Sequence, residues 1–427
     1  MSTRVTGMSC SVCGTQVPLG TPLQWVCPHA GPTDRHHVLG FDVVTDDSDA
    51  LASDNPFLSF REQLGVDAFG AAVGLDEATR IEIIASLDRA VEMVDGTGFR
   101  KTPLHRADAL SDVLGFSAQG GVWIKDETHN VAGSHKARHL FTELVYLLMA
   151  ERAGVTPWSD VTDRPPLAIA SCGNAAIAAS TLARAMQWPI AVHVPVAAQD
   201  SVLDALHSLD ADVRVCPRRD SDPAGDPCVW RFRELVQHGA LPFGVQGTEN
   251  VWCLDGGRTL GWEIAEQISQ IDRVFMQVGG GAFASTFATS FYAEGHSARL
   301  HAVQTEGCAP LVRAWKQFVE MGSPSAIGAI WSEVMWPWEH TPTSFADGIL
   351  DDETYDWIDI VGHMQTSQGG AVRALESNIV RAHHMAHEYT DIDVSPTGSS
   401  GLAGVLEIRD EIDADEKVLV MFSGRSR

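Results

Sequence analysis

Hydrophobic positions along the chain alternate between helical and strand-like spacing, and this alternation predicts an α/β protein with a mainly parallel sheet. From Arg80 to Val94 apolar residues recur at helical spacing, and Gly96 and Gly98 then break the pattern. The predicted strands are residues 121–125, 166–170, 190–194, 213–215 and 273–278. The predicted helices include one with Leu140, Phe141, Leu144, Val145 and Leu148 on a single face, an alanine-rich one ending at Met186, residues 201–209, and one starting at Phe283.

The length of 427 residues exceeds what a single hydrophobic core usually fills, so we expect two core domains. Residues 1–40 are rich in turns and lack helical periodicity, which predicts a small N-terminal extension. We assign residues 137–244 to a small domain, and residues 41–136 together with 245–427 to a large domain.

The formal charge of −26 makes nucleic acid and anionic membranes unfavourable partners, because like charges repel. The sequence shows no run of 18 apolar residues and no apolar segment of signal-peptide type at its N-terminus. We therefore expect a cytoplasmic protein.

The eight cysteines are scattered through the chain, which favours free thiols over a disulfide framework. Cys10 and Cys13 form a Cys-x-x-Cys pair, and Cys27 and His29 follow. These four residues could close a tetrahedral zinc site, with His36 and His37 as rivals of His29 for the fourth position. A ribbon that has lost its metal is the alternative.

Lys136 is one of only five lysines, and it follows Gly133, Ser134 and His135 just before a long amphipathic segment. A lysine amine whose charge is suppressed can form a Schiff base with an aldehyde cofactor. An ordinary lysine at the start of a helix is the structural alternative.

A second candidate site follows the strand 273–278, where Gly279, Gly280, Gly281 and Ala282 lead into a helix. Backbone N–H groups at such a junction hold phosphate. The same residues fit a dinucleotide-binding loop in which Glu306 would contact the ribose, and a purely structural glycine turn is the third interpretation.

Two further loops carry polar groups. Ser171, Cys172, Gly173 and Asn174 lie between a strand and a helix, where they could receive a carboxylate, although Asn174 could simply cap the helix. Thr397 precedes another helix and is either a cap or a hydroxyl that points into a site.

Taken in order, Lys136, the Asn174 loop, the Gly279 loop and the Thr397 turn resemble the signatures of fold-type II pyridoxal-phosphate enzymes, and among these the chain most resembles threonine synthase. Supporting stretches are residues 98–104, 126–130, 255–263, 304–310 and 342–348. The N-terminal Cys-x-x-Cys ribbon also occurs in some members of that group. The resemblance implies two parallel-sheet domains of the tryptophan synthase β type and a homodimer.

The resemblance also implies roles for individual residues. Lys136 would hold pyridoxal 5'-phosphate and shuttle the substrate α-proton, and Asn174 would contact the ring hydroxyl. Residues 279–282 would cradle the phosphate, and Thr397 would bond the pyridine nitrogen, where a neutral hydroxyl favours elimination over transamination. The implied residues for binding an amino acid substrate are Ser134, Ser171, Cys172, Gly173, Arg138 and Lys125.

The lysine segment departs from the usual threonine synthase pattern Asn-Pro-Thr-Gly-Ser-Phe-Lys-Asp-Arg. Val131 and Ala132 replace Pro-Thr, His135 replaces Phe, and Ala137 replaces Asp. A hydroxyl that could help to receive a phosphorylated substrate is therefore missing, while Arg138 and Lys125 remain available for an anionic side chain.

We accordingly predict a pyridoxal-phosphate-dependent carbon–oxygen lyase that acts at Cβ or Cγ of an amino acid. A hydroxy-amino-acid dehydratase or a β-replacement enzyme is the nearest alternative. More distant alternatives are an NAD(P)-dependent oxidoreductase built on the Gly279 loop and a non-catalytic ligand sensor or scaffold.

Overall fold

The computed structural model of the chain describes residues 2–31, 33–46, 52–222 and 225–427. By contact, the chain divides into two compact units. Unit 1 comprises Met1–Lys101, Asn130–Thr259 and Arg427, and unit 2 comprises Thr102–His129 and Leu260–Ser426. The domains 1–40, 41–136 with 245–427, and 137–244 remain a prediction.

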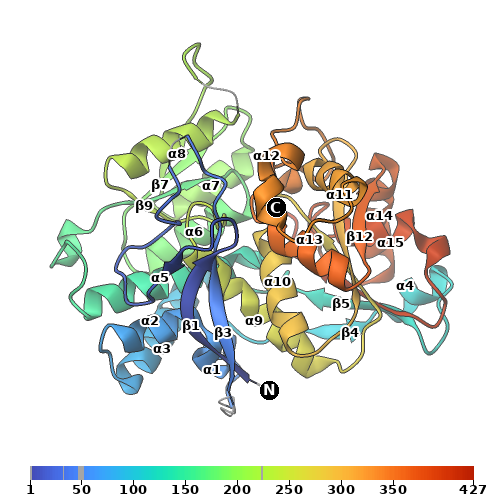
Figure 1. Cartoon of the computed structure of the whole chain (residues 1–427), viewed down its shortest axis with the longest axis horizontal. Helices are drawn as coiled ribbons and strands as arrows, with labels where there is room; N and C mark the ends of the chain where they lie inside the picture. The colour runs from blue at the N-terminus through green and yellow to red at the C-terminus, as the bar shows by residue number, and fades with distance from the viewer. Residues whose placement is uncertain (1, 32, 47–51, 223–224) are drawn as a thin grey trace. The chain divides into compact units, whose positions relative to one another are not determined.

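Unit 1 begins with a small antiparallel sheet in the order β2-β1-β3, and β1 and β3 run side by side (Figure 1). Its strands are β1 (Ser2–Cys10), β2 (Gln16–Val17) and β3 (Leu39–Asp46). The register of β1 against β3 shifts between Val5 and Gly7, so that Val5, Met8 and Cys10 are all buried. This irregularity turns Cys10 to the inside at the end of the strand.

The second sheet of unit 1 is parallel throughout, in the order β8-β7-β6-β9. Its strands are β6 (Leu167–Ala170), β7 (Ile190–Val194), β8 (Asp212–Val215) and β9 (Leu241–Pro242). The helices of this unit are α1 (Pro56–Ser59), α2 (Gly65–Ala72), α3 (Glu77–Asp95), α5 (Lys136–Arg152), α6 (Asn174–Ala185), α7 (Asp200–Ser208) and α8 (Pro227–Gln237), with 3₁₀ turns η1 (Arg61–Gln63), η2 (Val131–Gly133) and η3 (Val161–Asp163). The helix α9 (Trp252–Gln267) begins in unit 1 and ends in unit 2.

Unit 2 contains a six-stranded sheet in the order β12-β11-β10-β13-β5-β4, in which only the edge strand β4 is antiparallel to its neighbour. Its strands are β4 (Leu104–Arg106), β5 (Gly121–Asp126), β10 (Arg273–Gln277), β11 (Arg299–Thr305), β12 (Gly370–Ala374) and β13 (Lys417–Phe422). The helices are α4 (Asp108–Val113), α10 (Ala282–Ala293), α11 (Pro310–Glu320), α12 (Trp331–Val334), α13 (Trp357–Thr366), α14 (Glu376–Tyr389) and α15 (Ser400–Glu407), with 3₁₀ turns η4 (Ile327–Ile330), η5 (Asp347–Ile349) and η6 (Arg409–Glu411).

The predicted α/β class is confirmed, and each predicted strand is present within one residue of its expected bounds. The inner strand β10 is buried along its whole length, and β13 is buried after its first residue, because helices cover the sheet. The helix α15 packs against both α14 and β10, and α14 and α15 lie together near the red end of the chain (Figure 1). In such a sheet the loops at the carboxyl ends of the parallel strands form the usual ligand site.

Candidate active site

The segment before Lys136 makes a strained turn in unit 1. Ala132 and Gly133 have φ values of 53° and 64°, in the left-handed region that a residue with a Cβ rarely adopts. The turn is held by Asn130, whose Oδ1 accepts the Val131 N–H at 2.8 Å, and by Asp95, whose Oδ1 accepts the Ala132 N–H at 3.1 Å. Strain of this kind persists where surrounding contacts enforce it, and it is frequent at active sites.

Ser134 lies two residues before Lys136 and its side chain has 0% exposure. Among the residues that the structure describes, none forms a hydrogen bond with its Oγ. A buried hydroxyl without a partner costs about 1–3 kcal/mol. The Ser134 hydroxyl is therefore a candidate to bond a polar group of a ligand.

The Asn174 loop lies beside the Lys136 segment. The helix α6, which begins at Asn174, packs against η2 and α5. Arg427 joins the two segments, because its Nε donates to Asn174 Oδ1 at 3.0 Å and its Nη2 donates to Ala132 O. Unit 1 thus brings together the start of α5 and the start of α6. Arg427 could not be predicted as a site residue from the sequence, because it lies in no local motif.

The other residues of the Asn174 loop are accessible. Ser171 and Gly173 are half-buried, Cys172 is exposed, and Ser171 Oγ accepts the Gly173 N–H at 3.4 Å. The N-cap residue of α6 is Gly173, which has no side chain that could cap the helix. The first N–H groups of a helix lack partners within the helix, so this end can receive an anion.

The Gly279 loop joins β10 to α10 in unit 2. A Cβ on Gly279 would lie 2.3 Å from Asp351 Oδ2, and one on Gly281, whose φ is 102°, would lie 2.9 Å from Thr354 Cγ2. The positive φ therefore favours glycine at position 281, and Gly279 lies against the Asp351 carboxylate. The helix α10 begins at Ala282, and its N-cap residue, Gly281, has no side chain that could cap it. The loop has the form of a phosphate cradle at a helix N-terminus.

Gln277, the last residue of β10, ties the Gly279 loop to the Thr397 turn. Its Nε2 lies 2.8 Å from Gly398 O, 3.3 Å from Thr397 O and 2.8 Å from Ser423 Oγ. Thr397 Oγ1 accepts the Gly348 N–H at 2.9 Å, so its own proton remains available for donation. Unit 2 thus brings the glycine loop and the Thr397 turn to the carboxyl ends of the neighbouring strands β10 and β13.

Lys125 and Arg138 are buried rather than presented to a ligand. Lys125 Nζ has bonds of 2.8 Å to Glu263 Oε2, 2.8 Å to Thr102 O and 2.9 Å to Gln267 Oε1. Arg138 is 1% exposed, and its Nη1 donates to Thr259 Oγ1 at 2.9 Å. Since both cations have protein partners in the interior, neither is carried into the proposed site, although the sequence predicted both as substrate-binding residues.

Glu306, the predicted ribose-binding acid, has a different partner. Its Oε1 accepts the Glu376 N–H at 2.8 Å, at the start of α14. This contact gives Glu306 a structural role as a helix cap and weakens the dinucleotide interpretation of the glycine loop.

One turn beyond Lys136, His139 is uncharged. Burial, helped by the positive charge of Lys136, lowers the pKa of His139 to about 3. Its Nδ1 lies 2.8 Å from Cys253 O, and because a carbonyl only accepts, this nitrogen carries the proton. The first turns of α5 therefore add no imidazolium charge near the Lys136 amine.

Glu143 lies in α5 two turns beyond Lys136, and its buried carboxyl group allows the effect of burial on stability to be tested. Burial raises the pKa of Glu143 well above its usual range, and Asn250 Nδ2 donates to its Oε2 at 2.8 Å. Because the pKa is higher in the folded than in the unfolded state, stability falls as pH rises from about 4.5 towards the folded pKa, by about 1.4 kcal/mol per pH unit. We expect Glu143→Gln to remove this fall, so that urea unfolding shows a gain over wild type at pH 8 but not at pH 4.

The exposed Glu82→Gln serves as the control, since Glu82 forms only a surface ion pair with Arg89. Its unfolding free energy should follow wild type at both pH values. If the Glu143→Gln profile also runs parallel to wild type, the carboxyl is ionised in the folded protein and the expectation is wrong.

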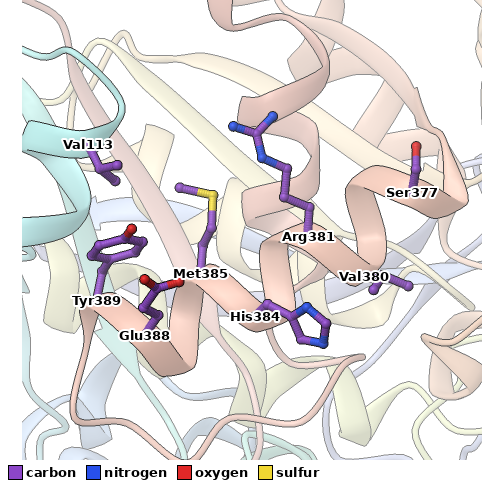
Figure 2. A pocket seen from close by; sticks show the side chains of 8 residues that line it. All are labelled: Val113, Ser377, Val380, Arg381, His384, Met385, Glu388 and Tyr389. Carbon is purple, nitrogen blue, oxygen red and sulfur yellow. The ribbon is translucent and has the colours of Figure 1, made fainter.

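The described cavities lie away from the predicted site residues. Figure 2 shows a cavity of about 400 Å³ beside α14, with Arg381, His384 and Glu388 among its lining residues. A second cavity, of about 240 Å³, contains Arg231 and Arg233. Arg231 and Arg233 form ion pairs with Asp222 and Glu249.

The N-terminal cysteines gather around a histidine other than the one predicted. Cys10, Cys13, Cys27 and His37 place one potential ligand atom each within 4.8 Å of one another. His29 instead lies with its Nδ1 3.2 Å from Thr15 Oγ1. We therefore replace His29 by His37 as the fourth candidate ligand.

Residues 96–424 match the model of the family described as "Pyridoxal-phosphate dependent enzyme", and the chain belongs to this family. Solved structures share its fold, which is that of the fold-type II members. Maize serine racemase matches with 18% identity and a TM-score of 0.60, covering 80% of this chain and 92% of that chain. The processed form of threonine deaminase isoform 2 from Solanum lycopersicum matches with 19% identity and a TM-score of 0.61, covering 83% and 92%.

Diaminopropionate ammonia lyase from Escherichia coli matches with 16% identity and a TM-score of 0.61, covering 82% of this chain and 89% of that chain. Comparison with curated proteins gives no match. In the described residues, no helix combines the length and the apolar character needed to cross a membrane.

The residues present fit pyridoxal phosphate, as the family requires. Unit 1 offers a lysine beside the partnerless Ser134 hydroxyl, and unit 2 offers a glycine cradle that a Cβ would fill. The family match favours a phosphate cradle over a dinucleotide-binding loop at Gly279.

Proposed function

We propose that the protein is a pyridoxal-phosphate-dependent lyase of threonine synthase type that removes a leaving group from Cβ or Cγ of an amino acid. The observation that carries this proposal is the buried, partnerless Oγ of Ser134 two residues before Lys136. This hydroxyl lacks a hydrogen-bond partner close to the lysine, and an amino acid substrate supplies a carboxylate and an amine as partners.

Each residue has a role within its own unit. Lys136 holds the cofactor through its amine and moves the proton between Cα and its Nζ. Asn174 contacts the ring hydroxyl, and Ser171 with the N–H groups of Cys172 and Gly173 receives the substrate carboxylate. Residues 279–282 bind the phosphate through their N–H groups. Pyridoxal phosphate supplies an electron sink for the charge that develops at Cα.

Thr397 favours elimination over transamination in this scheme. Its hydroxyl can donate to the ring nitrogen without forcing it to take a proton, whereas a carboxylate would stabilise the protonated ring. The bond that Thr397 Oγ1 accepts from Gly348 N–H orients the hydroxyl for donation.

Arg427 is the cation that we propose for an anionic group of the substrate. Its guanidinium already spans Asn174 and Ala132, and a planar guanidinium binds carboxylate or phosphate through two N–H groups. Arg138 and Lys125, the cations expected from the sequence, are engaged in the interior.

A hydroxy-amino-acid dehydratase or β-replacement enzyme is the second candidate. Two observations favour it: Ala132 has no hydroxyl for a phosphorylated side chain, and the structures with a similar fold include a threonine deaminase and an ammonia lyase. We propose a homodimer in the cytoplasm for either activity.

Product analysis tests the proposal. The purified protein, supplied with pyridoxal phosphate, is incubated separately with O-phosphohomoserine, threonine and serine. Inorganic phosphate together with threonine from the first substrate supports the synthase, and an α-keto acid from the others supports the dehydratase. Protein that binds pyridoxal phosphate yet turns over none of the three contradicts both, and protein that cannot bind it removes the basis of the proposal.

A further inference from the structure

Two distances within the cysteine cluster of unit 1 match those of a tetrahedral zinc site. Cys13 Sγ lies 3.6 Å from Cys27 Sγ, and Cys10 Sγ lies 3.5 Å from His37 Nδ1. With Zn–S bonds of about 2.3 Å and Zn–N bonds of about 2.0–2.1 Å, a tetrahedron places two sulfur atoms about 3.8 Å apart and sulfur and nitrogen about 3.6 Å apart. Both measured distances agree with that geometry to within about 0.2 Å.

The backbone presents the ligands from turns and strand ends. Cys10 ends β1, and a turn in which Gly14 N–H donates to Cys10 O at 2.9 Å places Cys13 beside it. Gly14 has φ 70°, which this turn requires. A second turn follows Cys27, with Ala30 N–H donating to Cys27 O at 2.9 Å. His37 comes from the segment just before β3.

Residues outside the cluster orient two of its ligands. Asp34 Oδ2 lies 3.5 Å from His37 Nε2, which leaves Nδ1 facing the thiols, an arrangement typical of metal-bound histidine. Thr15 Oγ1 lies 3.1 Å from Cys13 Sγ and 3.2 Å from His29 Nδ1. His29 can therefore donate to Thr15, which donates in turn to a Cys13 thiolate.

The loop between Cys13 and Cys27 contacts the helices that follow the lysine segment. Trp25 O accepts the Val251 N–H at 2.8 Å, and Gln24 O accepts from Trp252 Nε1 at 2.9 Å. The Trp25 ring packs edge-on against Tyr146 of α5 at 5.4 Å, and Tyr146 stacks on Trp252 at 4.1 Å. A metal ion that holds Cys13 and Cys27 in place would therefore also hold the loop between them, which packs against α5 and the start of α9.

We infer that Cys10, Cys13, Cys27 and His37 bind one structural Zn²⁺ ion, and that this ion stabilises α5, the helix that begins at Lys136. A Cys₃His set with four protein ligands is typical of closed structural sites and leaves no position for a substrate. The site is separate from the proposed activity, since zinc content and stability can be measured without turnover.

Metal analysis of the full-length protein tests the inference. Wild type, reconstituted with Zn²⁺ under reducing conditions, should hold one zinc per chain, and His37→Ala should hold at least tenfold less at the same free zinc concentration. His36→Ala is the matched control, because His36 lies outside the cluster, and it should keep one zinc. His37→Cys should restore binding by completing a Cys₄ set. Wild type without zinc, or His37→Ala with full zinc, would overturn the inference.

Two further measurements guard against a variant that fails to fold. Asp34→Asn leaves all four ligands in place and should weaken zinc binding about tenfold, as loss of an outer-shell partner does. Unchanged affinity contradicts the assigned His37 geometry. A zinc chelator should lower the thermal unfolding midpoint of wild type, and an unchanged midpoint after complete zinc removal would refute the stabilising role.

Discussion

Alanine in place of Lys136 is expected to abolish covalent attachment of pyridoxal phosphate and to lower turnover by at least about 10³-fold, because the amine both holds the cofactor and moves the proton. The fold should survive, since Lys136 is the first residue of α5 and alanine is a good helix former. The cofactor should still bind without the covalent link, because the Gly279 cradle is unchanged. Borohydride reduction followed by peptide mapping measures the attachment, and circular dichroism measures the fold.

Lys316→Ala is the matched control, since this exposed lysine has only a surface ion pair, 3.9 Å from Glu320. It should retain the label on the Lys136 peptide and full turnover. A Lys136→Ala protein that keeps its turnover, or a label found on another lysine, would show that the anchor has been misassigned.

The second large effect is expected at Lys125. Lys125→Met should lower the free energy of unfolding by about 3–5 kcal/mol, because it leaves the Glu263 carboxylate buried without its cation. Both side chains have 0% exposure, so water cannot replace the lost partner. Urea unfolding measures the loss. A substrate-binding lysine would instead raise KM and leave stability nearly unchanged.

The double variant Lys125→Met with Glu263→Leu provides the control. Removing both charges should recover part of the lost stability, since an apolar pair of similar volume can replace a buried ion pair. Recovery would be incomplete, because Glu263 Oε2 also accepts the Thr102 N–H at 3.0 Å. A double variant less stable than Lys125→Met would contradict the ion pair as the source of the effect.

The sheet strands could be predicted from the sequence because buried parallel strands are short apolar runs bounded by turn residues. The runs at 190–194 and 273–277 are buried along their whole length. The glycine loop could also be predicted from the sequence, since it lies directly between such a strand and a helix. The strands and the glycine loop could be predicted because both depend only on residues that are neighbours in the sequence.

The remaining features depend on contacts between distant residues. Lys125 lies in β5, close in sequence to the lysine segment. Its buried ammonium is paired with Glu263, which is 138 residues away. Arg427 reaches Asn174 across 253 residues. Spacing along the chain favoured His29 over His37 as the fourth ligand. His37 comes close to Cys10 through the pairing of β1 with β3, which no short motif reveals.

The position of β13 in the sheet has a consequence for biosynthesis. This strand pairs with β10 through Val420 and Phe275 and with β5 through Val420 and Ile124. On the ribosome, β5 and β10 emerge long before the strand that must join them, so the nascent chain carries two open strand edges until residues 417–422 leave the exit tunnel. Open edges promote aggregation. We therefore expect the growing chain to need chaperone protection until residues 417–422 have emerged, and the phosphate cradle to form only after that point.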